Sequence, residues 1–205
     1  MRVDALAQVR FKEITRREGY EQVVEGIRVA QEVGFNPVKV NAVTIGGMTE
    51  DQVVQFGHFA GETGVEIRFI EFMPLDADNA WEREKVLFAH EIIDSLNREI
   101  MPLIPVKHQD KSAPATEFVF EDGVGRIGFI ASISRPFCES CNRFRLTADG
   151  KQRNCRFSLV ETDVKSIIRG GGSDDDIAAA VREINAVKKE RKSGVEGKSG
   201  VVGCR

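Results

Sequence analysis

The chain has 205 residues, of which 41% are hydrophobic and 30% are charged, and its formal net charge is −3 at pH 7. This balance is typical of a globular protein of one or two domains and excludes a disordered chain. No apolar run approaches the roughly 18 residues of a membrane-spanning helix, and the slight acidic excess argues against nucleic-acid binding. Residues 1–5 lack the apolar stretch of a signal peptide, so we expect a cytoplasmic protein with reduced thiols.

Apolar periodicity predicts alternating helices and strands in the first half of the chain. Apolar residues recur on one helical face over 20–34, and β-branched residues alternate over 37–45. Thr49 is a good helix start, which predicts a second helix over 50–62, and a second strand is expected over 65–73. Helix, strand, helix and strand at this spacing predict βα units and a parallel sheet.

The pattern changes after residue 101, where shorter apolar runs indicate antiparallel strands. The elements expected in this half, after a helix over 90–99, are strands at 117–120, 126–133 and 144–149 and helices at 162–169 and 174–190. We therefore expect a first domain over 1–101, a second over 102–190 and a flexible tail over 191–205.

The cysteines indicate a metal or redox site. Cys138, Cys141 and Cys155 have the spacing C-x2-C-x13-C, and a turn at 148–150 can return the third thiolate to the first two. A disulfide is disfavoured in a reducing compartment, and a thioredoxin-like pair would open a helix. A structural zinc site remains an alternative, although His108 does not have the spacing of a fourth ligand. An iron–sulfur cluster held by three thiolates would leave one iron without a protein ligand.

Several basic residues accompany these cysteines. If 143–146 is extended, Arg143 and Arg145 point to the same side and suit a polyphosphate, the alternative being a solvated basic face. Lys39 lies on the first expected strand, where it is either paired, bound to an anion or in water at a sheet edge. Met73 follows the second strand, at the end where ligands gather, although alone it would be assigned to the core.

The segment FCESCNRFRLTADG, followed by Cys155, Arg156 and Phe157, closely resembles a motif of the GTP 3′,8-cyclase family of molybdenum cofactor biosynthesis. That family shows FCxxCNRxRLTADGxxxxCLF with the same thirteen-residue gap. Segments 11–27, 34–43 and 65–74 are similar to the family's mid-barrel segments in the same order. The resemblance covers roughly 11–190.

The resemblance implies a radical S-adenosylmethionine enzyme with an α/β fold, a partial TIM-type βα barrel followed by a C-terminal iron–sulfur-binding subdomain. In the family, one [4Fe-4S] cluster cleaves S-adenosylmethionine to a 5′-deoxyadenosyl radical. That radical abstracts a hydrogen from the GTP ribose, and the carbon then attacks the purine. The resemblance also implies a homodimer and a downstream cyclic pyranopterin monophosphate synthase that consumes the product.

Carried over by position, the resemblance implies a role for each candidate residue. Cys138, Cys141 and Cys155 would hold a second [4Fe-4S] cluster whose open iron meets the guanine. Met73 would contact S-adenosylmethionine, and the residues implied in GTP binding are Lys39, Arg143, Phe144 and Arg145.

The chain also departs from the family. The radical-generating C-x3-C-x2-C motif and the Gly-Gly tail of the family are not found in these 205 residues. We therefore expect no catalytic residue in this chain, and no 5′-deoxyadenosine formation by the chain alone. The alternatives are a non-catalytic module that binds an iron–sulfur cluster and a purine nucleotide, and a zinc-stapled structural domain.

Overall fold

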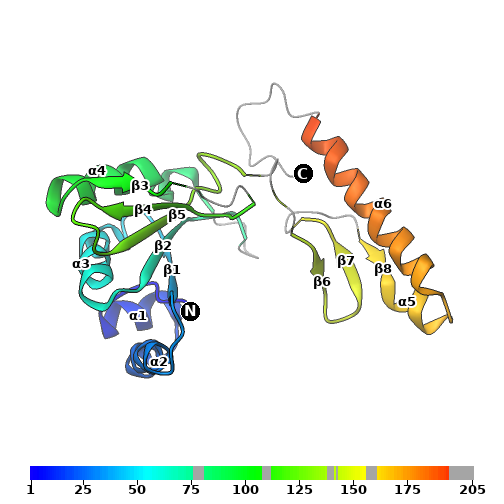
Figure 1. Ribbon diagram of the computed structural model, residues 1–205, viewed down its shortest axis with the longest axis horizontal. Coiled ribbons are helices and arrows are strands. Elements are labelled where there is room, and N and C mark those ends of the chain that lie inside the picture. Colours follow the sequence, from blue (N-terminus) through cyan, green and yellow to red (C-terminus); the bar gives the residue numbers. More distant parts are fainter. Residues whose placement is uncertain (76–80, 108–111, 138–140, 142, 156–160, 194–205) are drawn as a thin grey trace. The chain divides into compact units, whose positions relative to one another are not determined.

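The computed structural model describes residues 1–75, 81–107, 112–137, 141, 143–155 and 161–193, with side chains up to residue 186 (Figure 1). The chain divides into two compact units, residues 1–136 and residues 137–205. The sequence-based division falls earlier, at 101–102. The difference arises because the strands after residue 102 pair with the sheet of the first unit. Among the described residues, no helix is long and apolar enough to cross a membrane.

The first unit contains the predicted alternation of helices and strands. Its elements are α1 (Gln8–Thr15), α2 (Tyr20–Glu32), β1 (Lys39–Thr44), η1 (Glu50–Gln52), α3 (Val53–Thr63), β2 (Glu66–Glu71), η2 (Arg83–Lys85), α4 (Ala89–Glu99), β3 (Leu103–Pro105), β4 (Thr116–Phe120) and β5 (Arg126–Ile130). Every helix and strand predicted before residue 101 is confirmed, with ends that differ by a few residues. Gly64 has a backbone φ of 71°, in the left-handed region, and ends α3 close to the helix end that the sequence predicted.

The sheet of the first unit is mixed. Its described strands follow the order β1-β2-β5-β4-β3, with β1, β2 and β5 parallel and β4 antiparallel to both of its neighbours. The parallel pairing of β1 with β2 and the antiparallel pairing of β4 with β5 are as predicted, whereas the parallel pairing of β5 with β2 was not expected from the sequence. The register places Lys39 opposite Glu66 and Thr44 opposite Glu71, so β1 and β2 start and end at the same levels.

The two faces of this sheet differ in polarity. On one face, Val40 of β1 and Ile67 and Phe69 of β2 are buried in an apolar core shared with α3 and α4. Burying each such side chain contributes about 1.5–3 kcal/mol to stability. Because side chains alternate along a strand, the other face of β1 and β2 carries Lys39, Glu66, Arg68 and Asn41. The core therefore fixes the strands, and the polar face is left for other contacts.

Gly57 lies where α3 approaches α4. A Cβ at Gly57 would lie 2.4 Å from the Ile100 side chain and 2.8 Å from the Leu96 side chain. Both contacts are with the ends of flexible side chains, so a larger residue at this position would require these two side chains to move.

The second unit has a small antiparallel sheet and two helices. Its elements are β6 (Arg145–Leu146), β7 (Lys151–Arg153), β8 (Thr162–Asp163), α5 (Val164–Arg169) and α6 (Asp174–Ser193), and the strand order is β6-β7-β8. The strand expected over 144–149 is shorter, because the chain turns at Gly150, which has a φ of 85°. Its backbone N–H donates to the Thr147 carbonyl at 3.0 Å.

Side-chain caps start both helices of the second unit. The Asp163 carboxylate accepts hydrogen bonds from the backbone N–H and the hydroxyl of Ser166 at the start of α5. Ser173 and Asp176 form a reciprocal pair at the start of α6, the Asp version of a capping box that the sequence predicted. The α6 helix continues to Ser193, three residues beyond its expected end at 190, and the rest of the expected tail lies outside the described residues.

Candidate functional site

The residues predicted to form a site lie in both units. Lys39 and Met73 belong to the first unit, and Cys141 and Cys155 belong to the second together with Arg143, Phe144 and Arg145. Cys138 lies outside the described residues. Each unit therefore presents its own part of the candidate site.

In the first unit, Lys39 is paired with acidic side chains. Its Nζ lies 3.3 Å from Oε2 of Glu66 and 3.3 Å from Oε1 of Glu117. Arg68 contacts the same two carboxylates, with its Nε 2.5 Å from Glu66 Oε1 and its guanidinium nitrogen 3.0 Å from Glu117 Oε1. Lys39, Glu66, Arg68 and Glu117 thus form a closed charge ring on the polar face of the sheet. Of the alternatives left open by the sequence, the paired lysine is the one observed.

Sequence reasoning did not find the acidic half of the charge ring. Glu66 begins β2, and Glu117 lies 78 residues after Lys39, so no local pattern links them. The usable signal was the parallel pairing of β1 with β2, which places the first residues of both strands side by side.

Met73 lies at the opposite end of the strands from Lys39. It is the second residue after β2, and its carbonyl accepts the backbone N–H of Leu75 at 2.8 Å. Lys39 is level with Glu66, and Glu71 is five residues further along β2, which is about 16 Å at the rise of an extended strand. The structure therefore does not place these two predicted residues next to each other.

The end of β2 is tied to two other segments by Glu71. Its buried carboxylate accepts the backbone N–H of Ala89 at 3.1 Å, and the backbone N–H groups of Ile133 and Ser134, each at 2.8 Å. The Ser134 hydroxyl donates a fourth hydrogen bond at 2.5 Å. Glu71 thus joins the start of α4 and the 133–134 turn to the strand that leads to Met73.

In the second unit, the β6–β7 hairpin brings two cysteines to one end. Arg145, the first residue of β6, pairs with Arg153, the last residue of β7. Cys141 comes four residues before β6 and Cys155 two residues after β7, so along the chain both lie on the side of the hairpin away from the Gly150 turn. The turn at 148–150 was predicted from the sequence, whereas the approach of the third thiolate to the first two stays a prediction. Both thiols are partly exposed.

Cys155 is held by a buried neighbour. Asn154 is 3% exposed, and its Nδ2 donates to the Ile184 carbonyl of α6 at 2.9 Å. This hydrogen bond connects the end of β7 to α6, so the backbone at Cys155 has a fixed support.

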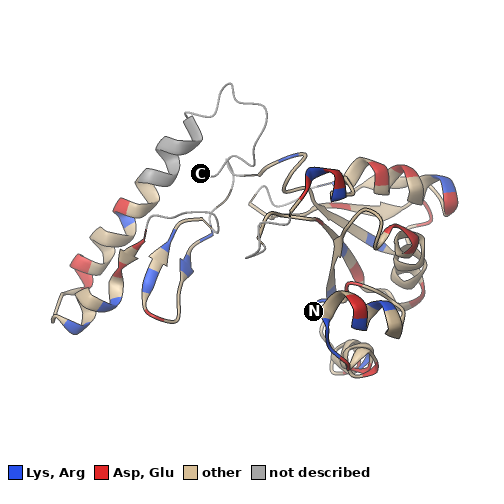
Figure 2. Ribbon diagram, turned by 180° about the vertical axis from the view of Figure 1, so that it is seen from behind, with Lys and Arg blue, Asp and Glu red and all other residues tan. Residues whose placement is uncertain are grey.

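The two predicted arginines differ in exposure from the residues between and after them. Exposure alternates from residue 143 to 146: Arg143 and Arg145 are half-buried, and Phe144 is 46% exposed. This agrees with the extended arrangement expected for the two arginines. The Arg143 guanidinium lies over the Phe137 ring, 4.7 Å from its centroid, and Arg145 has Arg153 as its cross-strand neighbour. Figure 2 shows the resulting basic colouring of β6 and β7.

Glu161 balances part of this positive charge. It forms ion pairs with Lys151, at 3.0 Å, and with Arg153. Hydrogen bonds from Lys151 and then Arg153 lower the pKa of the Glu161 carboxyl, and the same contact raises the pKa of Lys151. Within the described residues, no ion pair to Arg145 is formed, so its guanidinium is the cation of β6 and β7 most available to an anion.

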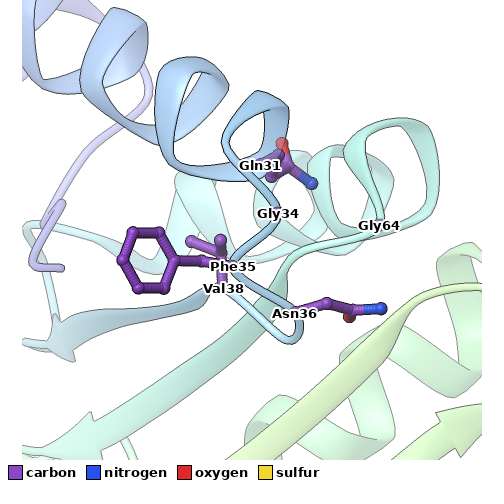
Figure 3. A pocket seen from close by; sticks show the side chains of 6 residues that line it. All are labelled: Gln31, Gly34, Phe35, Asn36, Val38 and Gly64. Carbon is purple, nitrogen blue, oxygen red and sulfur yellow. The ribbon is translucent and has the colours of Figure 1, made fainter.

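A pocket of about 480 Å³ lies at the start of β1 (Figure 3). Its lining comes from the α2–β1 connection and the end of α3, namely Gln31, Gly34, Phe35, Asn36, Val38 and Gly64. This lining has no charged side chain, and the Gln31 amide already donates to the Thr63 carbonyl. The pocket contains none of the residues predicted from the sequence, and we assign it no role in the candidate site.

The thiols of the second unit suit a soft metal. In the part of the chain that the structure describes, which does not include Cys138, no three His, Cys, Asp or Glu side chains gather as metal ligands. Cys141 and Cys155 nevertheless share one end of the hairpin, and Cys138 is three residues from Cys141. Thiolates are the donors that iron–sulfur clusters and zinc prefer, so the donor set fits such a group.

Comparison with known proteins gives the class. The family described as "Molybdenum Cofactor Synthesis C" matches residues 65–194, more than half of the chain, and the chain belongs to this family. The match covers the second half of the first unit, from β2 onward, and the second unit with its cysteines and arginines.

Individual relatives narrow the comparison. The chain is 42% identical over 183 residues to a GTP 3′,8-cyclase of Rhodopirellula baltica, covering 88% of the chain and 51% of that protein. It is 41% identical over 176 residues to a GTP 3′,8-cyclase of Streptomyces coelicolor, covering 86% and 52%. It is also 35% identical over 193 residues to human molybdenum cofactor biosynthesis protein 1, covering 94% and 30%. The chain thus spans about half the length of the bacterial relatives.

Proposed function

We propose that this chain is the GTP-binding and cluster-binding part of a GTP 3′,8-cyclase, a radical S-adenosylmethionine enzyme of molybdenum cofactor biosynthesis. The observation that carries the proposal is the β6–β7 hairpin, which has two cysteines at one end and arginines along one side. Membership of the family and identity to named cyclases over most of the chain support it. The first unit would be part of the βα barrel, and the second unit would be the iron–sulfur subdomain.

In this proposal, Cys138, Cys141 and Cys155 hold a [4Fe-4S] cluster. With three protein ligands, one iron keeps a position at which a purine nitrogen or oxygen can bind. Asn154 supports this arrangement by fixing the backbone next to Cys155 through the Ile184 carbonyl. Free thiolates for a cluster are expected in a reducing compartment, so the proposal includes a cytoplasmic location.

The arginines and Lys39 would bind the rest of GTP. The guanidiniums of Arg143 and Arg145 can each make two parallel hydrogen bonds to phosphate oxygens. Arg145 forms no ion pair within the described residues, so its donors are available for such bonds. The exposed Phe144 ring between them offers an apolar surface against the nucleotide. Lys39 would provide a further cation to the triphosphate, and Met73 would contact S-adenosylmethionine.

The proposed reaction needs further partners. The resemblance to the family implies a homodimer, and a cyclic pyranopterin monophosphate synthase would consume the cyclised nucleotide. A [4Fe-4S] cluster that cleaves S-adenosylmethionine would have to come from outside these 205 residues, because all four cysteines lie at 138 or later. Incubation of the chain alone with S-adenosylmethionine and a reductant should therefore yield no 5′-deoxyadenosine.

The experiment is anaerobic reconstitution followed by iron, sulfide and zinc analysis. We expect about four iron and four sulfide per chain, as a [4Fe-4S] cluster requires. Cys138→Ser, Cys141→Ser and Cys155→Ser should each lose most of this iron. Cys204→Ser is the matched control, since it removes a thiol outside the motif and should keep the full content. Zinc without sulfide would contradict the proposal and favour a zinc-stapled domain.

GTP binding tests the second half of the proposal. Titration of the reconstituted chain with GTP should give saturable binding that Arg145→Gln weakens. ATP serves as the control ligand, because it has the same triphosphate and a different purine edge. Equal binding of both nucleotides would contradict recognition of guanine by the open iron.

A further inference from the structure

The two acids of the charge ring are not equivalent. Glu66 is 1% exposed and pairs with both Lys39 and Arg68, whereas the Glu117 side chain is 23% exposed. Removing one partner from a deeply buried ion pair is far costlier than exchanging a partly exposed one for another anion. Glu66 is therefore the permanent partner of the two cations, and Glu117 is the partner that can be exchanged.

Glu117 contacts Arg68 across β5, which has a glycine at the position between them. In the sheet, Arg68 of β2 lies opposite Gly128 of β5, and Gly128 lies opposite Glu117 of β4. A Cβ at Gly128 would come within 3.1 Å of the Arg68 side chain and 3.6 Å of Glu66 Oε1. Glycine at this position makes room for the Arg68 side chain, which Glu117 contacts from the far side of β5.

A single oxygen of Glu117 serves both cations. Its Oε1 lies 3.3 Å from Lys39 Nζ and 3.0 Å from the Arg68 guanidinium. A phosphate oxygen can accept the same two hydrogen bonds and carries comparable or greater negative charge. Lys39 is 38% exposed, so an anion from solvent can reach it without prior opening of the core.

We propose that Glu117 is a specificity-determining residue that occupies Lys39 and Arg68 until a polyphosphate replaces it. The inference rests on the proposed function, in which Lys39 binds a nucleoside triphosphate. With Glu117 in place, Lys39 and Arg68 each already have two carboxylate partners. A ligand must therefore outcompete an internal carboxylate, which disfavours monoanions and neutral nucleosides and admits a polyphosphate chain.

The first test measures Lys39 directly. Competitive labelling with an amine-reactive reagent, followed by mass spectrometry, gives the reactivity of Lys39 relative to the other lysines of the whole chain. We expect Glu117→Gln to raise the labelling rate of Lys39 about threefold to fivefold, the size typical of a partly exposed ion pair. Glu121→Gln is the matched control, since it removes an exposed carboxylate of the same hairpin outside the ring and should leave the rate unchanged.

The second test measures affinity for inorganic tripolyphosphate by calorimetry. Glu117→Gln should bind it about threefold to fivefold more tightly than the unmodified chain, and Glu121→Gln should not. Glu117→Asp is the second variant, because its shorter carboxylate cannot reach both cations and should give the same gain with the charge retained. Circular dichroism of each variant verifies that the sheet is intact. Tripolyphosphate should also protect Lys39 from labelling.

The outcomes separate this inference from the proposed function. An unchanged Lys39 labelling rate in both Glu117 variants would overturn the inference, even if GTP binds normally. Faster labelling with tighter tripolyphosphate binding would support it, and failure of GTP to bind would then count against the proposed function alone. Tripolyphosphate binding that is equal in the unmodified chain and in both variants would also overturn the inference.

Discussion

Gln152 gives the sharpest stability prediction. It lies on β7 against α5 and α6, its side chain is fully buried, and neither Oε1 nor Nε2 has a hydrogen-bond partner in the described part of the chain. A buried polar group without a partner costs about 1–3 kcal/mol, and this amide has two such groups. Its replacement by methionine removes both while keeping an unbranched chain of similar volume.

The magnitude follows from these terms. Two unpartnered groups set the possible gain at about 2–6 kcal/mol. Repacking a core around a side chain of similar volume usually costs less than about 1.5 kcal/mol. The gain less the full repacking cost is about 0.5–4.5 kcal/mol, and we expect Gln152→Met to stabilise the second unit by an amount in this range. For a unit of this size, the melting temperature should rise by at least about 2 °C.

The assay is urea unfolding of the full chain. Hydrogen exchange of the β7 amides monitors this unfolding, so that the second unit is observed by itself. Gln52→Met is the control, because Gln52 is also buried but its Oε1 accepts the Leu6 N–H at 3.1 Å. The same chemical change should there destabilise the first unit by about 1–3 kcal/mol. A lower unfolding midpoint for Gln152→Met than for the unmodified chain would refute the reasoning.

Three further predictions concern hydrogen bonds of the same structure. Asn154→Ala removes the bond to the Ile184 carbonyl and should lower the stability of the second unit by about 1–3 kcal/mol in urea unfolding, and an unchanged midpoint would contradict this. Glu71→Gln replaces an acceptor of four hydrogen bonds by a group that is half donor, and should destabilise the first unit by about 2–3 kcal/mol in thermal melts, with Glu62→Gln as an exposed control. Hydrogen bonds from Ser166 and Ser173 lower the pKa of Asp163 and Asp176 from the ordinary aspartate value, so their contribution to stability is present above the unfolded-state pKa and is lost as the pH falls through the lower folded-state pKa values. Melting temperatures measured from pH 7 to pH 2 should show this loss, and Asp176→Asn should reduce its size.

The first unit was largely predictable because its signals are local. The apolar periodicity of α2 and α3 and the alternation in β1 and β2 each extend over enough residues to identify the element. The short strands β3 and β8 were not predicted, and β7 was expected only as the returning arm of a hairpin, without bounds. They have two or three residues each, and pairing with neighbours rather than their own pattern defines them. The compact units divide at 136–137 and not at the expected 101–102 for the same reason, since β3 to β5 join the sheet only through tertiary pairing.

The candidate site divides in a similar way. The C-x2-C-x13-C spacing and the turn before Lys151 were sufficient to predict the hairpin that brings Cys141 and Cys155 to one end. The roles of the cysteines and arginines remain predictions. Glu117 could not be recognised as a partner of Lys39, because the two residues meet only after the sheet has formed. Gln152 could not be recognised as a buried residue, because it lies in a run of polar residues and is covered only when β7 packs against α6.

The carboxylate of Glu71 has a consequence for local opening. The start of α4 and the 133–134 turn share this one acceptor, so neither segment can detach from the end of β2 without leaving a buried charge with fewer partners. Segments that share such a group open as one cooperative unit. The amides of Ala89, Ile133 and Ser134 should therefore exchange with a common opening free energy, even though more than forty residues separate them in the chain. The segment that leads into the second unit is accordingly as stable as the helix start with which it shares this anchor.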